Sequence, residues 1–251
     1  MKFSEEQFKY YRNYSLSFLE TTKSCIPVLT DTGKFIQDFY KGVDVPRSII
    51  FCHDIIKRVR ENLFCLTIYP PQEDNSVPLR LILRCVFGDL IWCTFVVANL
   101  GNDEVLKPFL DFNDLSAVVG KKSFAESEIG FFKLCGNDNY IEYFNPKIED
   151  LSKTHDEILL PYGSKSKLRK LTKTTTADIA EYFLTNEELK DLYPVLYGPF
   201  KMLSQVEHYA NENRSYSYFS ESTAFFFSRF AISYKIAIDC LCSEIKSIIS
   251  K

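Results

Sequence analysis

Polar residues near the end of the chain are the best candidates for acid–base chemistry. Lys201, Ser204 and His208 recur at spacings of three or four residues, so they share one face if this segment is helical. An imidazole beside a hydroxyl can take or give a proton, and a nearby cation can stabilise a developing anion. The pattern therefore favours His208 as an acid–base group supported by Lys201. A solvated polar face is the alternative interpretation.

A basic run lies further toward the N-terminus. Five cations and no acidic residue occur between Gly163 and Lys173: Lys165, Lys167, Arg169, Lys170 and Lys173. Beside the N-terminus of a helix, such a run can bind the phosphates of RNA, DNA or a nucleotide. Because Ser, Leu and Thr separate the cations in place of aromatic residues, the run does not predict base recognition. A solvated loop is the alternative.

Two charged residues, Arg84 and Asp89, interrupt an apolar stretch at 79–98. A charge persists inside a helical bundle only when it is paired or hydrogen-bonded, so both residues need partners from other helices. Two interpretations stay open. One is a polar pocket at the centre of the bundle, and the other is a buried ion-pair network that fixes the register of the helices.

Helices must position these groups, because apolar residues recur at helical spacing through most of the chain. Predicted helices begin near Ser4, Lys34, Ser48, Leu79 and Thr176, and a long helix ends the chain. The first is expected to end before Pro27. The core is predicted to form from the helices that begin at Ser48 and Leu79 and from the last helix.

Between residues 101 and 150, helical periodicity weakens. Short apolar pieces are separated by Pro108, Gly120, Gly130, Gly136 and Pro146, and residues 129–135 and 140–144 are candidate short strands. We therefore predict a mostly α-helical bundle that forms a single domain over residues 1–251. It contains a long central apolar helix and an irregular insertion at 101–150.

Composition restricts the function classes. The chain has 251 residues, 46% of them hydrophobic, and a net charge of −3, so any anion-binding site must be local. The charged N-terminus lacks a signal-peptide pattern, which predicts a cytoplasmic protein with reduced cysteines. Six of these are predicted as small buried residues: Cys25, Cys52, Cys65, Cys85, Cys93 and Cys135. The longest apolar run, 90–98, is too short to span a bilayer.

Two segments resemble uncharacterised bacterial all-helical proteins near the HEPN superfamily. Residues 78–92, PLRLILRCVFGDLIW, are similar to their central helix, in which an Arg is followed by an acidic residue. Residues 200–208, FKMLSQVEH, are similar to a later segment in which Leu-Ser is followed by His. The resemblance implies a helical homodimer that cleaves RNA without a metal ion, or an inactive partner in a toxin–antitoxin or phage-defence system.

The HEPN catalytic pattern is an Arg, four to six further residues and a His. No Arg lies five to seven positions before His208, and Lys201 occupies the seventh of these positions. Arg47 does satisfy the spacing with His53, so these two residues join His208 and Lys201 as candidate catalytic residues. An accidental match near a helix start is the alternative.

Two functions therefore stay open. In the first, the protein acts on or binds RNA in a bacterial defence or toxin–antitoxin setting and, if it is an enzyme, is a metal-independent ribonuclease. In the second, it is a catalytically silent helical module that binds a protein partner or a phosphate-bearing ligand through the basic run and the Arg84–Asp89 region. Neither hypothesis predicts a metal ion or a cofactor.

Overall fold

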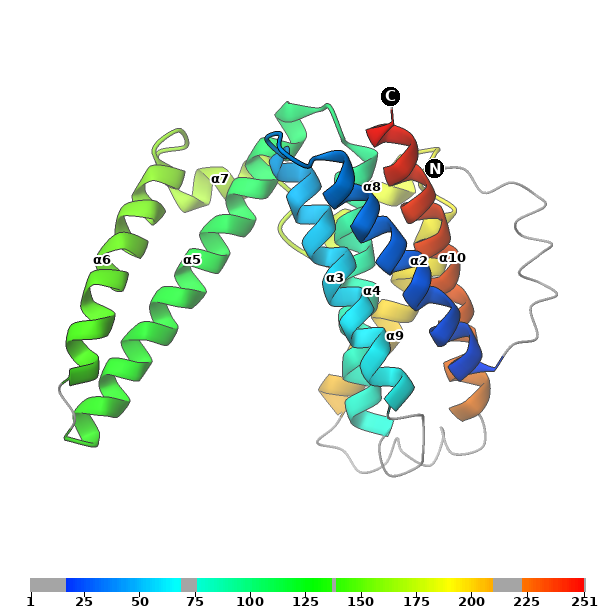
Figure 1. Cartoon of the computed structure of the whole chain (residues 1–251), viewed down its shortest axis with the longest axis horizontal. Helices are drawn as coiled ribbons and strands as arrows, with labels where there is room; N and C mark the ends of the chain where they lie inside the picture. Colours follow the sequence, from blue (N-terminus) through cyan, green and yellow to red (C-terminus); the bar gives the residue numbers. More distant parts are fainter. Residues whose placement is uncertain (1–16, 69–75, 137–138, 210–222, 251) are drawn as a thin grey trace. The chain divides into compact units, whose positions relative to one another are not determined.

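The computed structural model describes residues 17–68, 76–136, 139–209 and 223–250, and all the regular structure in these ranges is helical (Figure 1). The helices are α2 (Phe18–Phe39), α3 (Arg47–Ile68), α4 (Ser76–Ala98), α5 (Asp103–Leu134), α6 (Asn139–Leu159), α7 (Lys165–Leu171), α8 (Thr176–Thr185), the π-helix η2 (Tyr193–Tyr197), α9 (Gly198–Tyr209) and α10 (Thr223–Ile249). The chain divides into a bundle unit, Met1–Leu100 with Thr175–Lys251, and a hairpin unit, Gly101–Thr174.

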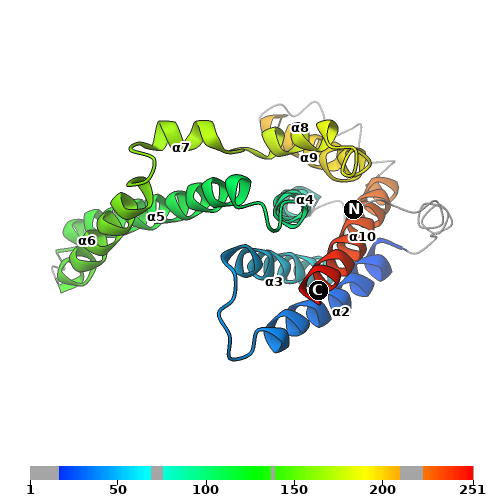
Figure 2. The same ribbon diagram turned by 90° about the horizontal axis from the view of Figure 1, so that it is seen from above.

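Helix α4 is the central element of the bundle unit. It packs against α3, α8, α9 and α10, while α2 packs against α3 and α10. Figure 2 views α4 nearly end-on, with α3 on one side and α8 and α9 on the other. A helix with neighbours on several sides must be apolar on several sides, which explains why α4 is the most apolar helix of this unit. The prediction of a long central apolar helix is confirmed.

The predicted apolar stripes of α3, α4 and α10 form the core. Six residues of α4 are at most 2% exposed: Leu79, Leu83, Val86, Leu90, Cys93 and Val97. Among the described residues, Pro78–Ala98 is the one helical stretch long and apolar enough to cross a membrane by length and composition, and 56% of its most apolar window is buried inside the structure. A central core helix meets the same criterion, so the packing of α4 accounts for its apolar composition.

Helix α2 differs from the two shorter helices predicted at this end of the chain. It begins after Ser17, whose side chain and backbone form a capping box with Glu20, and it runs through Pro27 to Phe39. The expected end before Pro27 is wrong, because this proline lies on the exposed face while Cys25 and Leu29 keep the apolar stripe continuous. The predicted helix start at Ser4 lies outside the described residues.

The hairpin unit corrects the prediction of an irregular segment with short strands. Residues 103–134 and 139–159 form α5 and α6, which pack against each other as an antiparallel hairpin (Figure 1). Gly120 and Gly130 lie within α5, where each costs only about 1 kcal/mol relative to alanine. Gly136, with φ +66°, ends this helix because it adopts the left-handed conformation that other residues avoid.

The end of the hairpin carries an aromatic cluster. Phe132 contacts Phe131 and Phe144, and Phe144 contacts Tyr143, with ring centroids 5.1–6.5 Å apart. The Lys147 ammonium lies 3.6 Å from the centroid of the Tyr143 ring. Even so, Phe131 and Tyr143 are 57% and 58% exposed. Two helices therefore cover these rings only in part.

Candidate functional site

Arg84 of α4 and two residues of α9 form a polar contact between segments of the bundle unit that are far apart in the sequence. The Arg84 Nε–H donates to Ser204 Oγ at 3.1 Å, and the guanidinium carbon lies 5.6 Å from the centroid of the Phe200 ring. Gly88 lies beside that ring, and a Cβ at this position would be 3.4 Å from it, in ordinary van der Waals contact. Ser204 in turn donates to the Phe200 carbonyl at 2.8 Å. The expectation that Arg84 needs a partner from another helix is confirmed.

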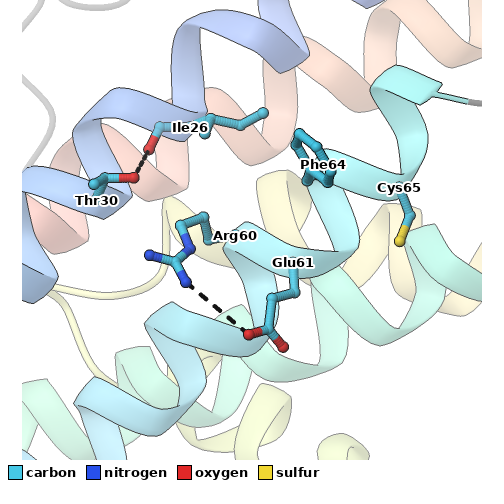
Figure 3. Close-up of a pocket in the computed structure, with 6 residues that line it drawn as sticks. All are labelled: Ile26, Thr30, Arg60, Glu61, Phe64 and Cys65. Carbon is cyan, nitrogen blue, oxygen red and sulfur yellow. Dashed lines mark hydrogen bonds and ion pairs between the residues drawn. The ribbon is translucent and has the colours of Figure 1, made fainter.

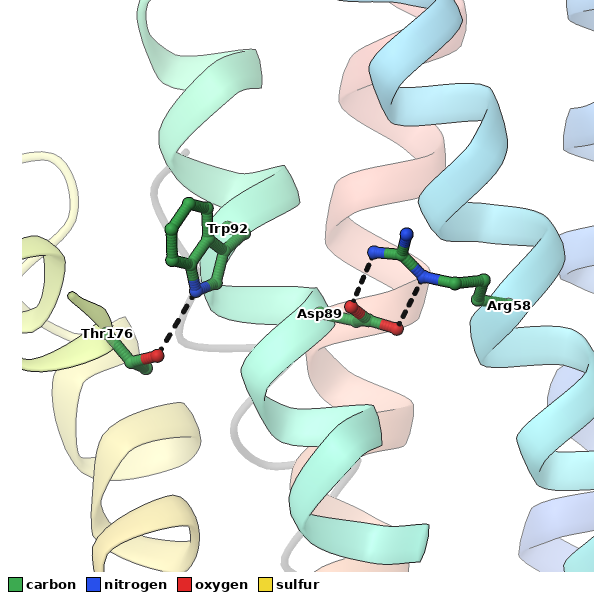
Figure 4. A network of polar contacts seen from close by, with 4 residues as sticks. All are labelled: Arg58, Asp89, Trp92 and Thr176. Atoms are coloured by element: carbon green, nitrogen blue, oxygen red, sulfur yellow. Dashed lines mark hydrogen bonds and ion pairs between the residues drawn. The ribbon is translucent and has the colours of Figure 1, made fainter. Parts of the chain in front are cut away.

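Asp89 has a different partner. Arg58 of α3 binds its carboxylate in bidentate fashion, with Nη2 2.7 Å from Oδ1 and Nε 3.2 Å from Oδ2 (Figure 4). This hydrogen bond to Asp89 raises the pKa of the Arg58 guanidinium above its ordinary value. The Asp89 side chain is 18% exposed and that of Arg58 is 56% exposed, so the pair lies at the edge of the bundle. Arg84 and Asp89 are thus directed to α9 and α3 respectively.

Trp92 of α4 and Asn99, which directly follows this helix, contact α8. The Trp92 indole donates to Thr176 Oγ1 at 3.1 Å (Figure 4), and the Tyr182 hydroxyl donates to Asn99 Oδ1 at 3.2 Å. The predicted cap at Thr176 is displaced by one residue, because Thr175 forms the capping box with Asp178. Together with Arg84 and Asp89, these contacts place α3, α8 and α9 at defined heights along α4. This arrangement favours the register interpretation over a shared central pocket.

His53 lies between α2 and α3. Its Nε2 is 3.2 Å from the Gln37 side-chain nitrogen, and its Nδ1 is 3.8 Å from the Asp54 carboxylate. Arg47 is the exposed first residue of α3. Six helical residues rotate a position by roughly 240° and advance it by about 9 Å, so Arg47 and His53 do not share a face. Their spacing therefore does not place them in one site on α3.

Lys201 and His208 both belong to α9. Lys201 is exposed, whereas Ser204, three residues later, is half-buried against Arg84. Position 208 follows Ser204 by one helical turn, but the side chain of His208 lies outside the described residues. The structure thus brings Arg84 to the α9 segment that contains the predicted acid–base group, where Lys201 is exposed.

The basic run is helical over much of its length. Ser164 caps α7 by accepting from the Lys167 backbone N–H at 3.3 Å, and the fully buried Leu168 packs this short helix against α5. The Tyr162 hydroxyl donates to the buried Asp111 of α5 at 2.6 Å, just before α7. All five basic side chains are exposed: Lys165, Lys167, Arg169, Lys170 and Lys173. The predicted solvated loop is therefore a solvated helix held at one face.

The cysteines divide into buried and exposed thiols. Cys25, Cys52, Cys93 and Cys242 are buried in the bundle unit, whereas Cys65, Cys85 and Cys135 are exposed, so the prediction of burial is wrong for these three. Burial raises the pKa of Cys25 to about 12 and that of Cys242 to about 11. A hydrogen bond with Cys52, together with burial, raises the pKa of Cys93. The described residues contain no cluster of His, Cys, Asp or Glu suited to a metal ion.

Sequence reasoning missed the partners of the candidate residues. Arg58 binds Asp89 from 31 positions away, and Gln37 contacts His53 from 16 positions away. Both partners lie on α2 or α3, helices whose apolar stripes are clear, but a stripe does not reveal which polar residue at its edge faces a neighbour. Neither a protein-family model, nor a curated protein, nor a solved structure matches this chain.

Proposed function

We propose that this protein binds RNA through the basic segment, residues 165–173 of the hairpin unit. The single observation that carries the proposal is the exposure of all five cations of this segment on and just after one short helix, without an intervening acid. Within the described part of the chain, none of the five forms an ion pair. They are therefore available to phosphate groups, which attract exposed lysine and arginine through salt-sensitive contacts.

The attachment of α7 supports a defined binding surface. Leu168 is buried against α5, and Tyr162 is hydrogen-bonded to Asp111, so the backbone that carries the cations is held just before α7 and at the middle of this helix. A backbone that is already ordered loses little conformational entropy when a ligand binds. The basic segment therefore meets a phosphate chain with its charges already gathered.

Charge elsewhere in the hairpin unit confines an anionic ligand to the basic segment. Helix α6 exposes five acidic side chains: Glu142, Glu149, Asp150, Asp156 and Glu157. These carboxylates repel phosphate, so a nucleic acid is attracted locally although the whole chain has a net charge of −3. RNA is the preferred nucleic acid here because the resemblance to HEPN-like proteins, itself part of this proposal, implies a role with RNA.

Fluorescence anisotropy with a short labelled single-stranded RNA tests the proposal. We expect the logarithm of the affinity to fall linearly with the logarithm of the salt concentration. Each phosphate contact contributes about 0.7 to that slope for a single strand, so a variant with Lys167→Ala, Arg169→Ala and Lys170→Ala should lose roughly 2 from the slope. Binding that is unchanged in this triple variant would exclude the basic segment.

A matched control removes three exposed or half-exposed lysines from α5 and α6. Lys121→Ala, Lys122→Ala and Lys153→Ala change the net charge by the same amount within the same unit. We expect the salt slope of this control to stay at the wild-type value. A duplex DNA of equal length serves as the second arm, and tighter binding to DNA than to RNA would contradict the choice of RNA.

A second candidate, metal-independent cleavage of the bound RNA, is favoured by the contact between Arg84 and Ser204. This bond directs a guanidinium to α9 one helical turn before position 208. A guanidinium can stabilise the charge that develops on a phosphate while an imidazole transfers a proton. Under this candidate, His208 is the acid–base group and Arg84 supports charge.

Incubation of the protein with RNA in EDTA tests the second candidate. We expect cleavage that is lost in His208→Ala and retained in His53→Ala, because His53 is engaged between α2 and α3. Loss of activity in His53→Ala alone would assign catalysis to the α2–α3 side instead. Intact RNA at high protein concentration would exclude catalysis and leave RNA binding as the function to be tested.

A further inference from the structure

A solvent-facing pocket lies between α2 and α3, within the bundle unit (Figure 3). Its lining consists of Ile26 and Thr30 from α2 and of Arg60, Glu61, Phe64 and Cys65 from α3. The volume is about 470 Å³, which falls within the range of roughly 300–1,000 Å³ that is common for small-molecule sites. The pocket belongs to none of the contacts assigned to RNA above.

The upper part of the pocket is apolar. Thr30 donates its hydroxyl hydrogen to the Ile26 carbonyl at 2.8 Å, so this hydrogen is used within α2 and the wall offers mainly the carbon atoms of both residues. Opposite them, the Phe64 ring is 55% exposed. An apolar group that covers both this exposed ring and the apolar wall lowers the free energy by about 25 cal/mol for each Å² removed from water.

One cation and one carboxylate, Arg60 and Glu61, define the polar end. Figure 3 shows the Arg60 guanidinium lying between Thr30 and Glu61. Its contact with the Glu61 carboxylate is 4.0 Å long, and the two side chains are 37% and 57% exposed. Such a long, exposed pair contributes little free energy. A carboxylate that approaches the guanidinium directly can form two hydrogen bonds of about 2.8 Å, which are stronger.

We propose that this pocket binds a small amphiphilic carboxylate. Its apolar chain packs between Ile26 and Phe64, and its carboxylate pairs with the Arg60 guanidinium. The apolar wall alone would accept any hydrophobic molecule. Because Glu61 lines the pocket beside Arg60, the preference for an anion depends on the ligand carboxylate replacing Glu61 as the partner of the Arg60 guanidinium. Because the pocket is open to solvent, the chain of the ligand is covered on the sides formed by the two helices.

Cys65 supplies a direct measurement of occupancy. Cys65 is a lining residue of the pocket and is exposed, whereas the exposed Cys85 and Cys135 belong to α4 and to the end of α5. Alkylation by iodoacetamide can be followed at each cysteine by peptide mass spectrometry. With decanoate below its micelle concentration as the probe, we expect Cys65 to react about six-fold more slowly at five times the dissociation constant, by mass action. Cys85 and Cys135 should react at unchanged rates and serve as internal standards.

The charge preference is tested with two further probes and one matched pair of variants. Decanol and decyltrimethylammonium carry the same chain without the carboxylate and should protect Cys65 at least ten-fold less effectively. Arg60→Gln should remove the difference between decanoate and decanol. Lys57→Gln deletes a positive charge from the same helix at an exposed position that does not line the pocket, and it should leave the preference intact.

Several results would overturn the proposal. Unchanged alkylation of Cys65 in saturating decanoate would exclude binding, and equal slowing of all three thiols would indicate a general coating of the surface. Protection by decyltrimethylammonium as strong as that by decanoate would remove Arg60 from recognition. Because Arg60 is partly exposed, Arg60→Gln is expected to fold, and its helical circular dichroism provides the check.

Discussion

The bundle unit and the hairpin unit use similar helices with different numbers of neighbours. In the bundle unit, α4 is covered by α3, α8, α9 and α10, and three of its polar residues and the following Asn99 each bind a neighbouring helix. In the hairpin unit, α5 packs against α6 and α7, and Phe124, Phe131 and Leu134 are 63%, 57% and 90% exposed. The helix with more packing partners is also the more apolar and the more buried, so partner number and apolar composition rise together in this pair of helices.

The largest expected difference between the units comes from core truncation. Phe87→Ala removes a fully buried ring that packs edge-on against Phe230 at 6.0 Å, and it should lower the free energy of unfolding by about 3–5 kcal/mol. Phe124→Ala removes a ring of the hairpin unit that is 63% exposed. This variant should change the free energy of unfolding by about 0.5 kcal/mol or less. Urea denaturation followed by circular dichroism measures both. Equal effects would show that the two units do not differ in packing.

Alkaline pH should destabilise the bundle unit through its buried thiols. The folded pKa values of Cys25 and Cys242, about 12 and about 11, exceed the ordinary value of 9.0. The unfolded chain therefore loses these protons first, so stability is full below pH 9 and falls as pH rises toward the folded values. The loss is about 1.4 kcal/mol per pH unit for each thiol in that window. Urea midpoints at a series of pH values measure it.

Two cysteine variants sharpen this test. Cys25→Ala removes one titrating group, so the free energy of unfolding of this variant should fall less per pH unit above pH 9. Cys135→Ala removes an exposed thiol from the hairpin unit and should leave the steepness unchanged. If the free energy of unfolding of Cys25→Ala falls with pH as much as that of the wild type, another buried group accounts for the loss. The Tyr234 hydroxyl, whose pKa is also raised by burial, is one such group.

A smaller effect is expected from the ion pair of α3 and α4. Asp89→Ala breaks a bidentate contact with Arg58 and should cost about 1 kcal/mol, because one partner is mostly buried. Glu157→Ala breaks the 4.0 Å pair with Lys153 in the hairpin unit, where both side chains are more than half exposed, and should cost about 0.3 kcal/mol or less. A double-mutant cycle with Arg58→Ala isolates the first coupling. A coupling near zero would remove the pair from the forces that fix α3 against α4.

The smallest effect is expected at the start of α2. The backbone N–H and the hydroxyl of Ser17 donate to the Glu20 carboxylate and hold its pKa below the ordinary value. The stabilisation is therefore present above the unfolded pKa and lost as pH falls through the folded one. Glu20→Gln should lower the melting temperature slightly at neutral pH and not at acidic pH. A difference that persists in acid would assign the effect to packing.

Sequence reasoning succeeded where a helix has one continuous apolar stripe. Cys52, Ile56 and Val59 of α3 are buried as their spacing predicted, and the stripe of α10 is buried at Phe230 and Tyr234. It failed at Pro27 and in residues 101–150, where proline and glycine suggested breaks that tertiary contacts override. An exposed proline within a long helix loses one hydrogen bond, whereas the buried face on either side continues to contribute.

The candidate site was harder to predict than the fold. Arg84 and Asp89 required partners because they interrupt an apolar helix, and both have them, but nothing in their spacing distinguishes Ser204, 120 positions away, from other polar residues. Selection of a partner depends on the height at which two helices cross, which is set by the packing of whole stripes. The basic segment was found directly, because its charges are adjacent in the chain.

The length of α5 has a consequence for the two exposed surfaces of the hairpin unit. Asp111, which binds Tyr162 just before the basic segment, and Leu134, beside the aromatic cluster, are both on α5. At 1.5 Å per residue they are about 35 Å apart along one continuous helix. A macromolecule seated at one end leaves the other end free for a second. The hairpin thus has the dimensions of a spacer between two simultaneous occupants.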